Sequence, residues 1–260
     1  MLRHATTLLG LTIIALPLKA QETHFARTMS PGERLELSNL NGQIRVTQGT
    51  GRDFDLVATT VVKSGDPRLV KVILEEGQGF VRVCTIYLTR DPNRTSCRGG
   101  NSTDDWTNRR GERLDISIDY EVRAPAGVKL EVDNVNGGVV LRGLDTPATV
   151  ETVNGGIAFD GVGAHRLSTV NGRITGRFTS SSWSGDLDLS TVNGAIDLTL
   201  PADFGAEIRG QTVNGGIDFG EFPVTMKGKW GPRTFTGTIG SGGRRVNIET
   251  VNGSVRLQRR

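Results

Sequence analysis

Two aspartates of this chain could, by their type and spacing, act together in acid–base chemistry. Asp197 and Asp218 each stand four residues after the asparagine of an Asn-Gly pair. If successive repeats stack as parallel strands, the two backbones lie about 5 Å apart. That value is near the carboxyl separation of retaining glycosidases. Two such carboxylates could also share a proton or bind Ca²⁺.

The other residues at this repeat position do not form an acidic groove. They are Arg45, Val140, Ala158, Thr175 and Arg256. Aromatic residues, which could offer a platform to a sugar, make up only 5% of the chain, and no such platform is expected beside this column of the repeat. We therefore interpret Asp197 and Asp218 as solvated residues on a polar face. A polysaccharide-active enzyme that uses these outward carboxylates is the alternative hypothesis.

The remaining candidate groups offer little chemistry. Once a leader over residues 1–20 is set aside, His24 and His165 are the only histidines, and neither has a partner at metal-ligand spacing. His165 occupies a repeat position that holds leucine or isoleucine elsewhere, which favours a core or rim histidine. There is no nucleophile-elbow motif and no phosphate-binding loop. We expect a protein that is not an enzyme, with no catalytic residues, no cofactor and no metal.

The chain has two cysteines, Cys84 and Cys97, separated by a polar segment. In an exported protein their natural state is a disulfide. Two free buried thiols are the alternative.

Residues 1–20 have the features of a secretory signal peptide. Arg3 precedes a short apolar run from Ala5 to Leu18, and Ala20 is a small residue at a plausible cleavage point. The remaining 240 residues carry 29 basic and 28 acidic side chains, a balance that gives no reason to expect nucleic acid or an anionic membrane as partner. No later segment is apolar enough to cross a bilayer. We expect export to the periplasm or cell surface.

An Asn-Gly pair recurs seven times along the chain. The pairs are Asn41 and Gly42, Asn136 and Gly137, Asn154 and Gly155, Asn171 and Gly172, Asn193 and Gly194, Asn214 and Gly215, and Asn252 and Gly253. From Asn136 the steps are 18, 17, 22, 21 and 38 residues, so a unit of about 20 residues repeats and one copy has lost its marker. We expect the degenerate copy in residues 233–243. Alternating apolar and β-branched residues on both sides of each pair predict strands.

The apolar residues change parity at each Asn-Gly pair, which predicts a bend. They stand at positions −6 and −4 before the asparagine and at +3 and +5 after it, and the valine at −1 shares the odd set. Both sets face one interior only if the chain turns between them, and asparagine and glycine tolerate the left-handed conformation that such a turn could use. We therefore expect structural Asn-Gly corners in which asparagines stack in a ladder and valines fill the interior. Repeated β-hairpins are the alternative.

The N-terminal half has a different pattern. Residues 33–47 match 128–142 and predict an early coil, residues 54–88 and 113–123 read as longer strands, and residues 91–112 form a polar loop. We predict an all-β protein: a β-region over 21–127 that packs on or caps the first coils, followed over 128–260 by a single-stranded, β-helix-like β-solenoid of about 20-residue coils.

Several motifs, in this order, resemble the bacterial putative-adhesin family, a group of exported β-strand-repeat proteins of unassigned function. They are "DYEVRAPAGVKLEVDNVNGGV", the serial "TVNG" units, "LPADFGAEIRGQTVNGGI", "GPRTFTGTIGSGG" and "ETVNGSVRL". The resemblance covers residues 31–260. It implies a β-solenoid-like fold on an exported protein and offers no catalytic residues to carry over.

We expect a non-catalytic, adhesin-like or structural module of the cell envelope that presents a repetitive polar surface to a protein or a glycan. A further hypothesis is a self-associating structural or sensing element. Because no cap follows Leu257, the C-terminal coil could pair with another copy.

Overall fold

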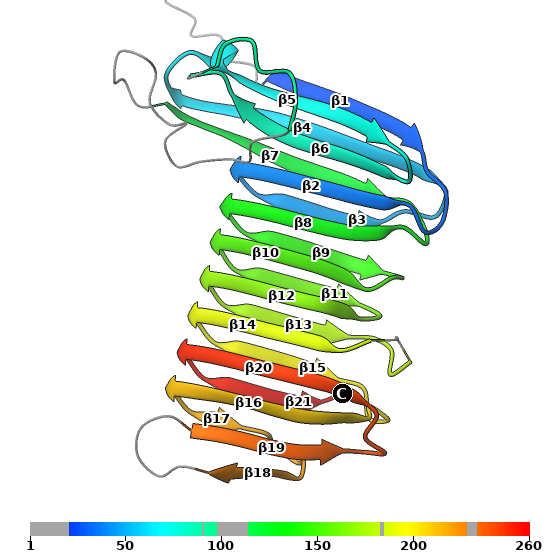
Figure 1. Ribbon diagram of the computed structural model, residues 1–260, viewed down its shortest axis with the longest axis vertical. Coiled ribbons are helices and arrows are strands. Elements are labelled where there is room, and N and C mark those ends of the chain that lie inside the picture. The colour runs from blue at the N-terminus through cyan, green and yellow to red at the C-terminus, as the bar shows by residue number, and fades with distance from the viewer. Residues whose placement is uncertain (1–20, 90, 98–113, 183–184, 228–232) are drawn as a thin grey trace, which may run out of the picture.

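The protein is built from two large β-sheets that face each other (Figure 1). The computed structural model describes residues 21–89, 91–97, 114–182, 185–227 and 233–260. The signal peptide predicted over residues 1–20 and most of the predicted polar loop therefore lie outside the described residues. No helix in the described ranges is long and apolar enough to span a membrane.

The order of the strands across each sheet differs from their order along the chain. Across the 10-stranded sheet lie β1 (Gln21–Thr28), β4 (Asp53–Ser64), β7 (Asp115–Ala124), β3 (Ile44–Gln48), β9 (Val139–Leu144), β11 (Ile157–Gly161), β13 (Ile174–Phe178), β15 (Ile196–Leu200), β21 (Val255–Arg259) and β17 (Ile217–Asp218). Across the 11-stranded sheet lie β18 (Val224–Lys227), β19 (Arg233–Ile239), β16 (Ala206–Asn214), β20 (Arg244–Asn252), β14 (Leu187–Asn193), β12 (Ala164–Asn171), β10 (Ala148–Asn154), β8 (Lys129–Asn136), β2 (Arg34–Asn41), β6 (Phe80–Tyr87) and β5 (Val70–Gly77), which a 3₁₀ turn (Pro67–Leu69) precedes.

Each Asn-Gly pair connects a strand of the 11-stranded sheet to a strand of the 10-stranded sheet. We call the two strands that flank one pair a rung. The rungs pair with one another in parallel and in register, so that Val150 lies beside Val132, and Ile157 beside Val139. Because the flanking strands belong to different sheets, the pairs are not hairpin turns, and the alternative of repeated hairpins is wrong.

Apolar side chains from both sheets meet between them in one continuous buried cluster. It extends from Met29 in the N-terminal region to Leu257 in the last strand. The alternation of buried and exposed residues along β10, β12 and β14 shows why: one side of each strand faces the partner sheet and the other faces solvent.

The sheets are mixed and open, so the stack of parallel rungs is only part of the fold. At one end, β1, β4 and β7 pair antiparallel in one sheet and β5 and β6 pair antiparallel in the other. At the opposite end, β16, β19 and β18 are antiparallel. The early coil predicted over 33–47 corresponds to β2 and β3, which lie directly between β8 and β9 and the N-terminal strands.

The order of the rungs corrects the sequence prediction, which assumed that coils stack in chain order. The C-terminal rung, β20 and β21, lies between the rung of β14 and β15 and the rung of β16 and β17 (Figure 1). Residues 233–243 are not a degenerate coil, because β19 runs antiparallel to β16 and pairs on its outer edge.

Side-chain volume explains why the rung of β16 and β17 lies next to β19. Gly210 stands at a position where the other rungs have valine, leucine or isoleucine facing inward. Phe235 of β19 lies opposite Gly210, is buried, and packs edge-on against Phe219 with ring centroids 4.9 Å apart. The missing side chain of Gly210 therefore leaves room for a phenylalanine that only the antiparallel strand supplies.

The corner glycines are required by close packing more than by a left-handed backbone. Gly42 and Gly137 have positive φ angles of 124° and 142°, but the other five corner glycines do not, and no non-glycine residue described has a positive φ. A Cβ atom on Gly172 would lie 2.0 Å from the carbonyl oxygen of Gly155 in the neighbouring rung. The expected left-handed corner is thus wrong for most rungs, and backbone contact between rungs is the reason for glycine.

Substitution of one corner glycine tests this reason. We expect Gly172→Ala to lower the free energy of unfolding by about 3 kcal/mol or more, since the added methyl meets backbone that cannot yield. Gly216→Ala is the matched control, because its Cβ would have no atom within 4 Å. Urea denaturation of the wild type and the two variants measures the difference in the free energy of unfolding. Equal losses for both variants would contradict the close-packing explanation.

Candidate binding surface

The seven corner asparagines form one hydrogen-bonded ladder along the molecule. Each Nδ2 donates to the Oδ1 of the next asparagine toward the N-terminal end, over distances of 2.8 to 2.9 Å. In donor order the ladder runs Asn214, Asn252, Asn193, Asn171, Asn154, Asn136 and Asn41. Asn41 then donates to the hydroxyl of Tyr87, which donates to the carbonyl of Ile116. All the amides point the same way, so the bonds polarise one another.

A second column, of buried threonines, lies two residues before the ladder. Thr152, Thr169, Thr191, Thr212 and Thr250 are each 5% exposed or less. Each hydroxyl donates to the carbonyl oxygen of a corner glycine in the adjacent rung, over 2.8 to 3.4 Å. These bonds satisfy acceptors that the sheets would otherwise bury without a partner.

The first two rungs make the same contact with asparagine. The Nδ2 atom of Asn134 donates to the carbonyl of Gly42 at 3.0 Å, and that of Asn39 donates to the carbonyl of Ile118 at 2.8 Å. This column is a structural feature that the sequence predictions missed. The signal was the recurrent threonine of "TVNG", which keeps the same parity as the inward apolar residues before it.

The valines that follow these threonines lie on the surface, which corrects the prediction that they fill the interior. In spatial order they are Val153, Val170, Val192, Val251 and Val213, and each is 38–40% exposed. We call them the valine column. The strand continues without a bend up to the asparagine, so position −2 faces inward with −4 and −6, and position −1 faces solvent. The polar threonine is therefore buried and the apolar valine exposed, which is the reverse of what hydrophobicity alone would predict.

The valine column borders a shallow groove on the outer face of the 11-stranded sheet. The groove has a volume of about 330 Å³, and valine, threonine and serine line most of it. Ser168 and Ser190 share a hydrogen bond of 2.8 Å across its floor, and Gln211 and Glu249 continue the same row. The arrangement offers apolar contact along one line and hydrogen bonds along the next.

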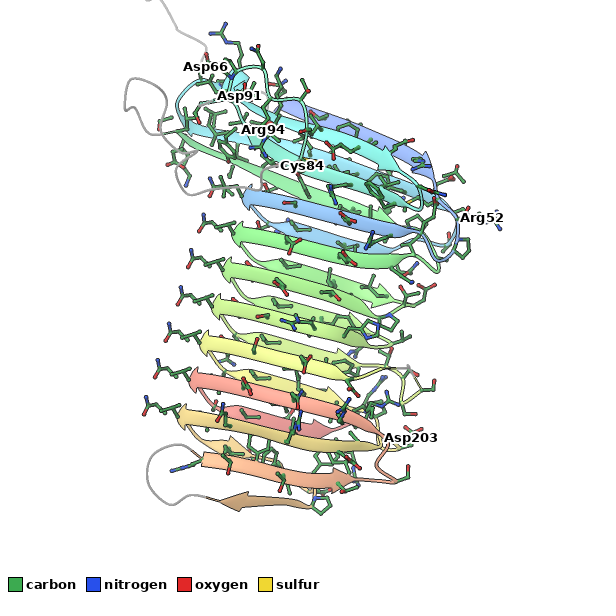
Figure 2. The ribbon with its side chains drawn as sticks, in the orientation of Figure 1. Arg52, Asp66, Cys84, Asp91, Arg94 and Asp203 are labelled. Carbon is green, nitrogen blue, oxygen red and sulfur yellow. A yellow bond between two sulfur atoms is a disulfide. The ribbon has the colours of Figure 1, made fainter. Side chains whose placement is uncertain are left out.

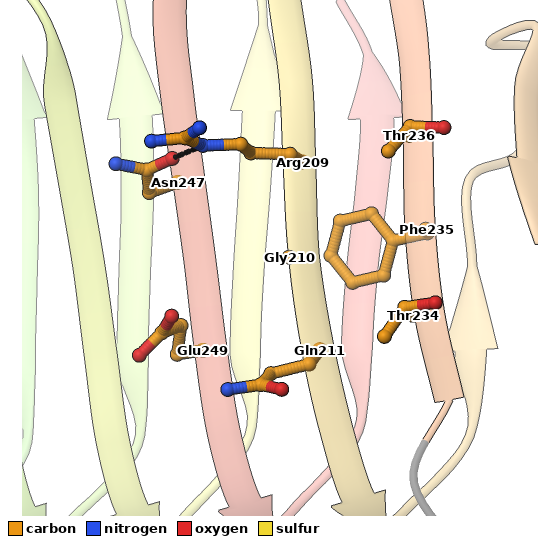
Figure 3. Close-up of a pocket in the computed structure, with 8 residues that line it drawn as sticks. All are labelled: Arg209, Gly210, Gln211, Thr234, Phe235, Thr236, Asn247 and Glu249. Carbon is orange, nitrogen blue, oxygen red and sulfur yellow. Dashed lines mark hydrogen bonds between the residues drawn. The ribbon is translucent and has the colours of Figure 1, made fainter.

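A second, more polar groove of about 300 Å³ lies over β20, β16 and β19 (Figure 3). Arg209 donates through Nε to Asn247 Oδ1 at 2.5 Å, and Asn247 Nδ2 donates to Asp188 at 2.6 Å. Asn247 therefore separates Arg209 from Asp188, because the C-terminal rung is inserted between their strands.

Charged residues dominate the same face near the N-terminal strands. Arg82 pairs with Glu36 at 2.5 Å, while Asp133 lies beside Glu151 of the next rung. Partial desolvation and the carboxylates of Glu151, Glu131 and Glu36 raise the pKa of Asp133 above its ordinary value of 3.8, and Arg82 opposes this shift. In the part of the chain that the structure describes, this end of the surface is polar and holds no column of exposed apolar residues.

Asp197 and Asp218 lie on the outer face of the other sheet, and they are not neighbours. The inserted C-terminal rung places Arg256 between them, with Nη1 3.9 Å from Asp197 and Nε 3.5 Å from Asp218. Their backbones are therefore two strand spacings apart, about 10 Å instead of the expected 5 Å. Arg173 also pairs with Asp197 at 3.0 Å. The pair lacks the geometry of a retaining glycosidase, and alternation of charge stabilises the observed rung order.

Neither histidine belongs to a cluster of functional groups. His24 lies on β1, and its Nε2 atom is 3.4 Å from a carboxylate oxygen of Glu22, with both side chains exposed. His165 is exposed at a bulge in the pairing of β10 with β12, and Ala164 takes the inward position that the repeat predicted for the histidine. In the described ranges no three His, Cys, Asp or Glu side chains gather to hold a metal ion.

Cys84 and Cys97 are joined by a disulfide with Cα atoms 5.9 Å apart. Cys84 lies on β6 near the N-terminal end of the molecule (Figure 2). Cys84, Ile86 and Leu88 form a small buried cluster of their own, against which Cys97 packs. The disulfide therefore holds the segment after β6 over the side of this strand that faces away from the main core.

An exchange of neighbouring residues tests the inward threonine and the outward valine. We expect Thr191→Val to lower the free energy of unfolding by about 1–3 kcal/mol, because the carbonyl of Gly172 loses its buried donor. Val192→Thr, one residue later, should change it by about 0.5 kcal/mol or less. Urea denaturation distinguishes the two. A larger loss for Val192→Thr would mean that the column faces are assigned wrongly.

The raised pKa of Asp133 predicts a pH-dependent stability. Because the folded state favours the protonated carboxyl, the contribution of Asp133 to stability falls as pH rises from the ordinary value of 3.8 through the raised one. Asp133→Asn, which stays neutral, should match the wild type in urea denaturation below this window and exceed it at neutral pH. The opposite order at neutral pH would show that the carboxylate is stabilised in the folded protein.

No family model and no curated protein matches the chain. Similar solved structures include a putative cell adhesion protein from Clostridium sporogenes, with 11% identity, a TM-score of 0.47, and coverage of 92% of this chain and 100% of that chain. A putative adhesin from Bacteroides fragilis has 13% identity, a TM-score of 0.34, and coverage of 93% and 99%.

A putative lipid binding protein from Parabacteroides distasonis has 10% identity and a TM-score of 0.25, and the match covers 92% of this chain and 98% of that chain. One of these neighbours is described as a putative adhesin, like the family that the sequence motifs resemble, and another as a putative cell adhesion protein. At these identities and TM-scores, the likenesses assign neither a partner nor an activity to this chain.

Proposed function

We propose that the protein is a non-catalytic, exported binding module of the cell envelope, and that the face with the valine column binds a protein. The observation that carries this proposal is the placement of exposed apolar residues. Of the six large hydrophobic residues that are exposed in the described ranges, five form the valine column, and Val61 on β4 is the sixth. Scattered exposed apolar residues are ordinary, whereas a continuous line of them is typical of an interaction surface.

The repeat of the column favours a protein with β-structure as its partner. We propose that the parallel rungs form a β-solenoid, in which equivalent side chains recur about every 4.8 Å. Stacked strands of a partner would have the same spacing, so their side chains could pack against successive valines. A glycan is less well matched, because the exposed apolar residues of the described ranges are all valines and none is aromatic.

The signal-like residues 1–20 and the disulfide support the proposed location. Disulfides persist in oxidising compartments such as the periplasm and the cell surface. The proposed module would act there without a cofactor, through contact alone.

Two other hypotheses have less support. A polysaccharide-active enzyme would use Asp197 and Asp218, yet Arg256 lies between these carboxylates and pairs with both. Self-association through the C-terminal coil needs that coil at an open end, yet β20 and β21 lie inside the stack. The strand that ends the 11-stranded sheet there is β18.

A charge placed in the valine column tests the proposed surface. Val192→Lys should reduce recovery of the protein partner from a bacterial envelope extract by roughly tenfold or more, as expected when a charge is buried at the centre of an interface. Val61→Lys is the matched control, because Val61 has nearly the same exposure, 39% against 40%, and lies outside the column. Circular dichroism establishes that both variants fold.

The outcomes separate the alternatives. The proposal predicts proteins that wild type and Val61→Lys retain and that Val192→Lys loses. Equal recovery by all three would overturn the assignment of the surface. Retention of polysaccharide without protein would replace the proposed partner class by a glycan.

A further inference from the structure

The seven Asn-Gly pairs raise a chemical question beyond binding, because this dipeptide can modify itself. The backbone nitrogen of the glycine can attack Cγ of the asparagine side chain, forming a C–N bond and releasing the side-chain nitrogen as ammonia. Water then opens the resulting succinimide to aspartate or isoaspartate. Glycine favours the attack because it has no side chain to hinder the approach. Whether a given pair reacts depends on how its atoms are held.

In most rungs the attacking nitrogen is held by a hydrogen bond. The backbone N–H groups of Gly42, Gly137, Gly155, Gly172 and Gly194 each donate to the backbone carbonyl of the asparagine in the next rung, over 2.9 to 3.1 Å. To react, such a nitrogen must break this bond and turn toward the side chain of its own rung. That movement requires local opening of two adjacent rungs.

The asparagine side chains of the inner rungs are held as well. Each donates through Nδ2 to one neighbour and accepts through Oδ1 from the other, as for Asn171, whose partners are Asn154 and Asn193. Both ends of the amide are therefore fixed, and Cγ cannot rotate toward the glycine nitrogen without the loss of two hydrogen bonds.

Among the described residues, the last rung of the ladder lacks both restraints. Asn214 donates to Asn252 at 2.9 Å, but its Oδ1 has no donor and the N–H of Gly215 has no acceptor among the described residues. The antiparallel strand β19 does not replace the missing rung, because its pairing with β16 ends at Thr212 opposite Arg233. Asn214 is exposed, and a Cβ on Gly215 would lie 1.8 Å from the carbonyl oxygen of Gly253, so the close contact between rungs persists here and only the hydrogen bonds differ.

The rung of Asn252 is intermediate. The N–H of Gly253 has no acceptor in the described part of the chain, but the Asn252 amide is bonded on both sides, to Asn193 and to Asn214.

We propose that Asn214 is a site of self-catalysed deamidation in the folded protein, and that the ladder protects the other six asparagines. The product carboxylate at position 214 has no proton to donate to Asn252, so two acceptors would face each other at the end of the ladder. Isoaspartate would also lengthen the backbone between β16 and β17. The modification therefore loosens the terminal rung and leaves the inner rungs intact.

The chain contains its own matched control for this proposal. The hexapeptide Thr-Val-Asn-Gly-Gly-Ile occurs at residues 152–157 and again at 212–217. Asn154 and Asn214 therefore have the same local sequence, and the intrinsic chemistry of the two pairs is equal. Any difference between their deamidation rates in the folded protein therefore comes from their different positions in the ladder.

The experiment incubates the purified protein in mildly alkaline buffer and follows each Asn-Gly peptide by mass spectrometry, which detects the gain of about 1 Da on deamidation. We expect Asn214 to convert at least roughly tenfold faster than Asn154, the factor that a modest cost of local opening supplies. In urea with reductant, the two should convert at equal rates. Asn214→Gln should abolish the fast phase without transferring it to another pair.

Each contrary result has a definite meaning. Equal rates for Asn154 and Asn214 in the folded protein would overturn the proposal, as would Asn41 at the opposite end reacting fastest. A rate difference that persists in urea would also overturn it, because the difference would then come from local sequence. None of these results depends on a binding partner, so the test is independent of the proposed function.

Discussion

The structure depends on the close approach of successive corners. The backbone carbonyl of one corner glycine lies where a side chain of the next corner glycine would stand, at about 2 Å from the missing Cβ atom. That carbonyl is also the acceptor for a buried threonine hydroxyl. The contact between successive corners therefore needs both a glycine, which leaves room for the carbonyl, and a threonine hydroxyl, which donates to it. If either were lost, the backbone would clash with its neighbour or leave a polar group unsatisfied.

This contact also determines which residues reach the surface. Because threonine must face inward to reach the glycine carbonyl, the next residue faces outward and the asparagine after it lies at the edge. The result is three parallel columns: buried threonine, exposed valine and hydrogen-bonded asparagine. The apolar line on the outer face, with which the proposed function is concerned, therefore follows from the internal hydrogen bond. In the same way, the open end of the asparagine column at Asn214 follows from the point where parallel stacking stops.

The insertion of the C-terminal rung shows how tertiary contacts choose among similar repeats. Every rung presents the same corner, so the backbone pairing alone would accept several orders. Side chains that differ between rungs remove this degeneracy. In the observed order Arg256 lies between Asp197 and Asp218, and Phe235 fills the space over Gly210. In chain order the two aspartates would be adjacent and like charges would repel one another.

The sequence by itself determined the all-β character, the rungs and the ladder, because these follow from local spacing that every repeat shares. It also indicated the cysteines as a pair and an N-terminal β-region that packs on or caps the first coils. Only the tertiary structure decided which rung lies beside which, the placement of β19 as an antiparallel edge strand, and the exposure of the valines.

The sequence alone could not decide these points, because each strand has two faces that could be buried and each repeat has several others beside which it could pack. Alternation states that Thr191 and Val192 face opposite sides. Which of the two is buried depends on whether the strand stays straight up to the asparagine or bends before it. A buried hydroxyl is favourable only when a carbonyl of another rung lies within reach. Likewise, the partner of Asp197 depends on a strand about 60 residues away along the chain. The buried face of a strand and the order of the rungs thus depend on contacts between distant segments, which form only when the chain folds.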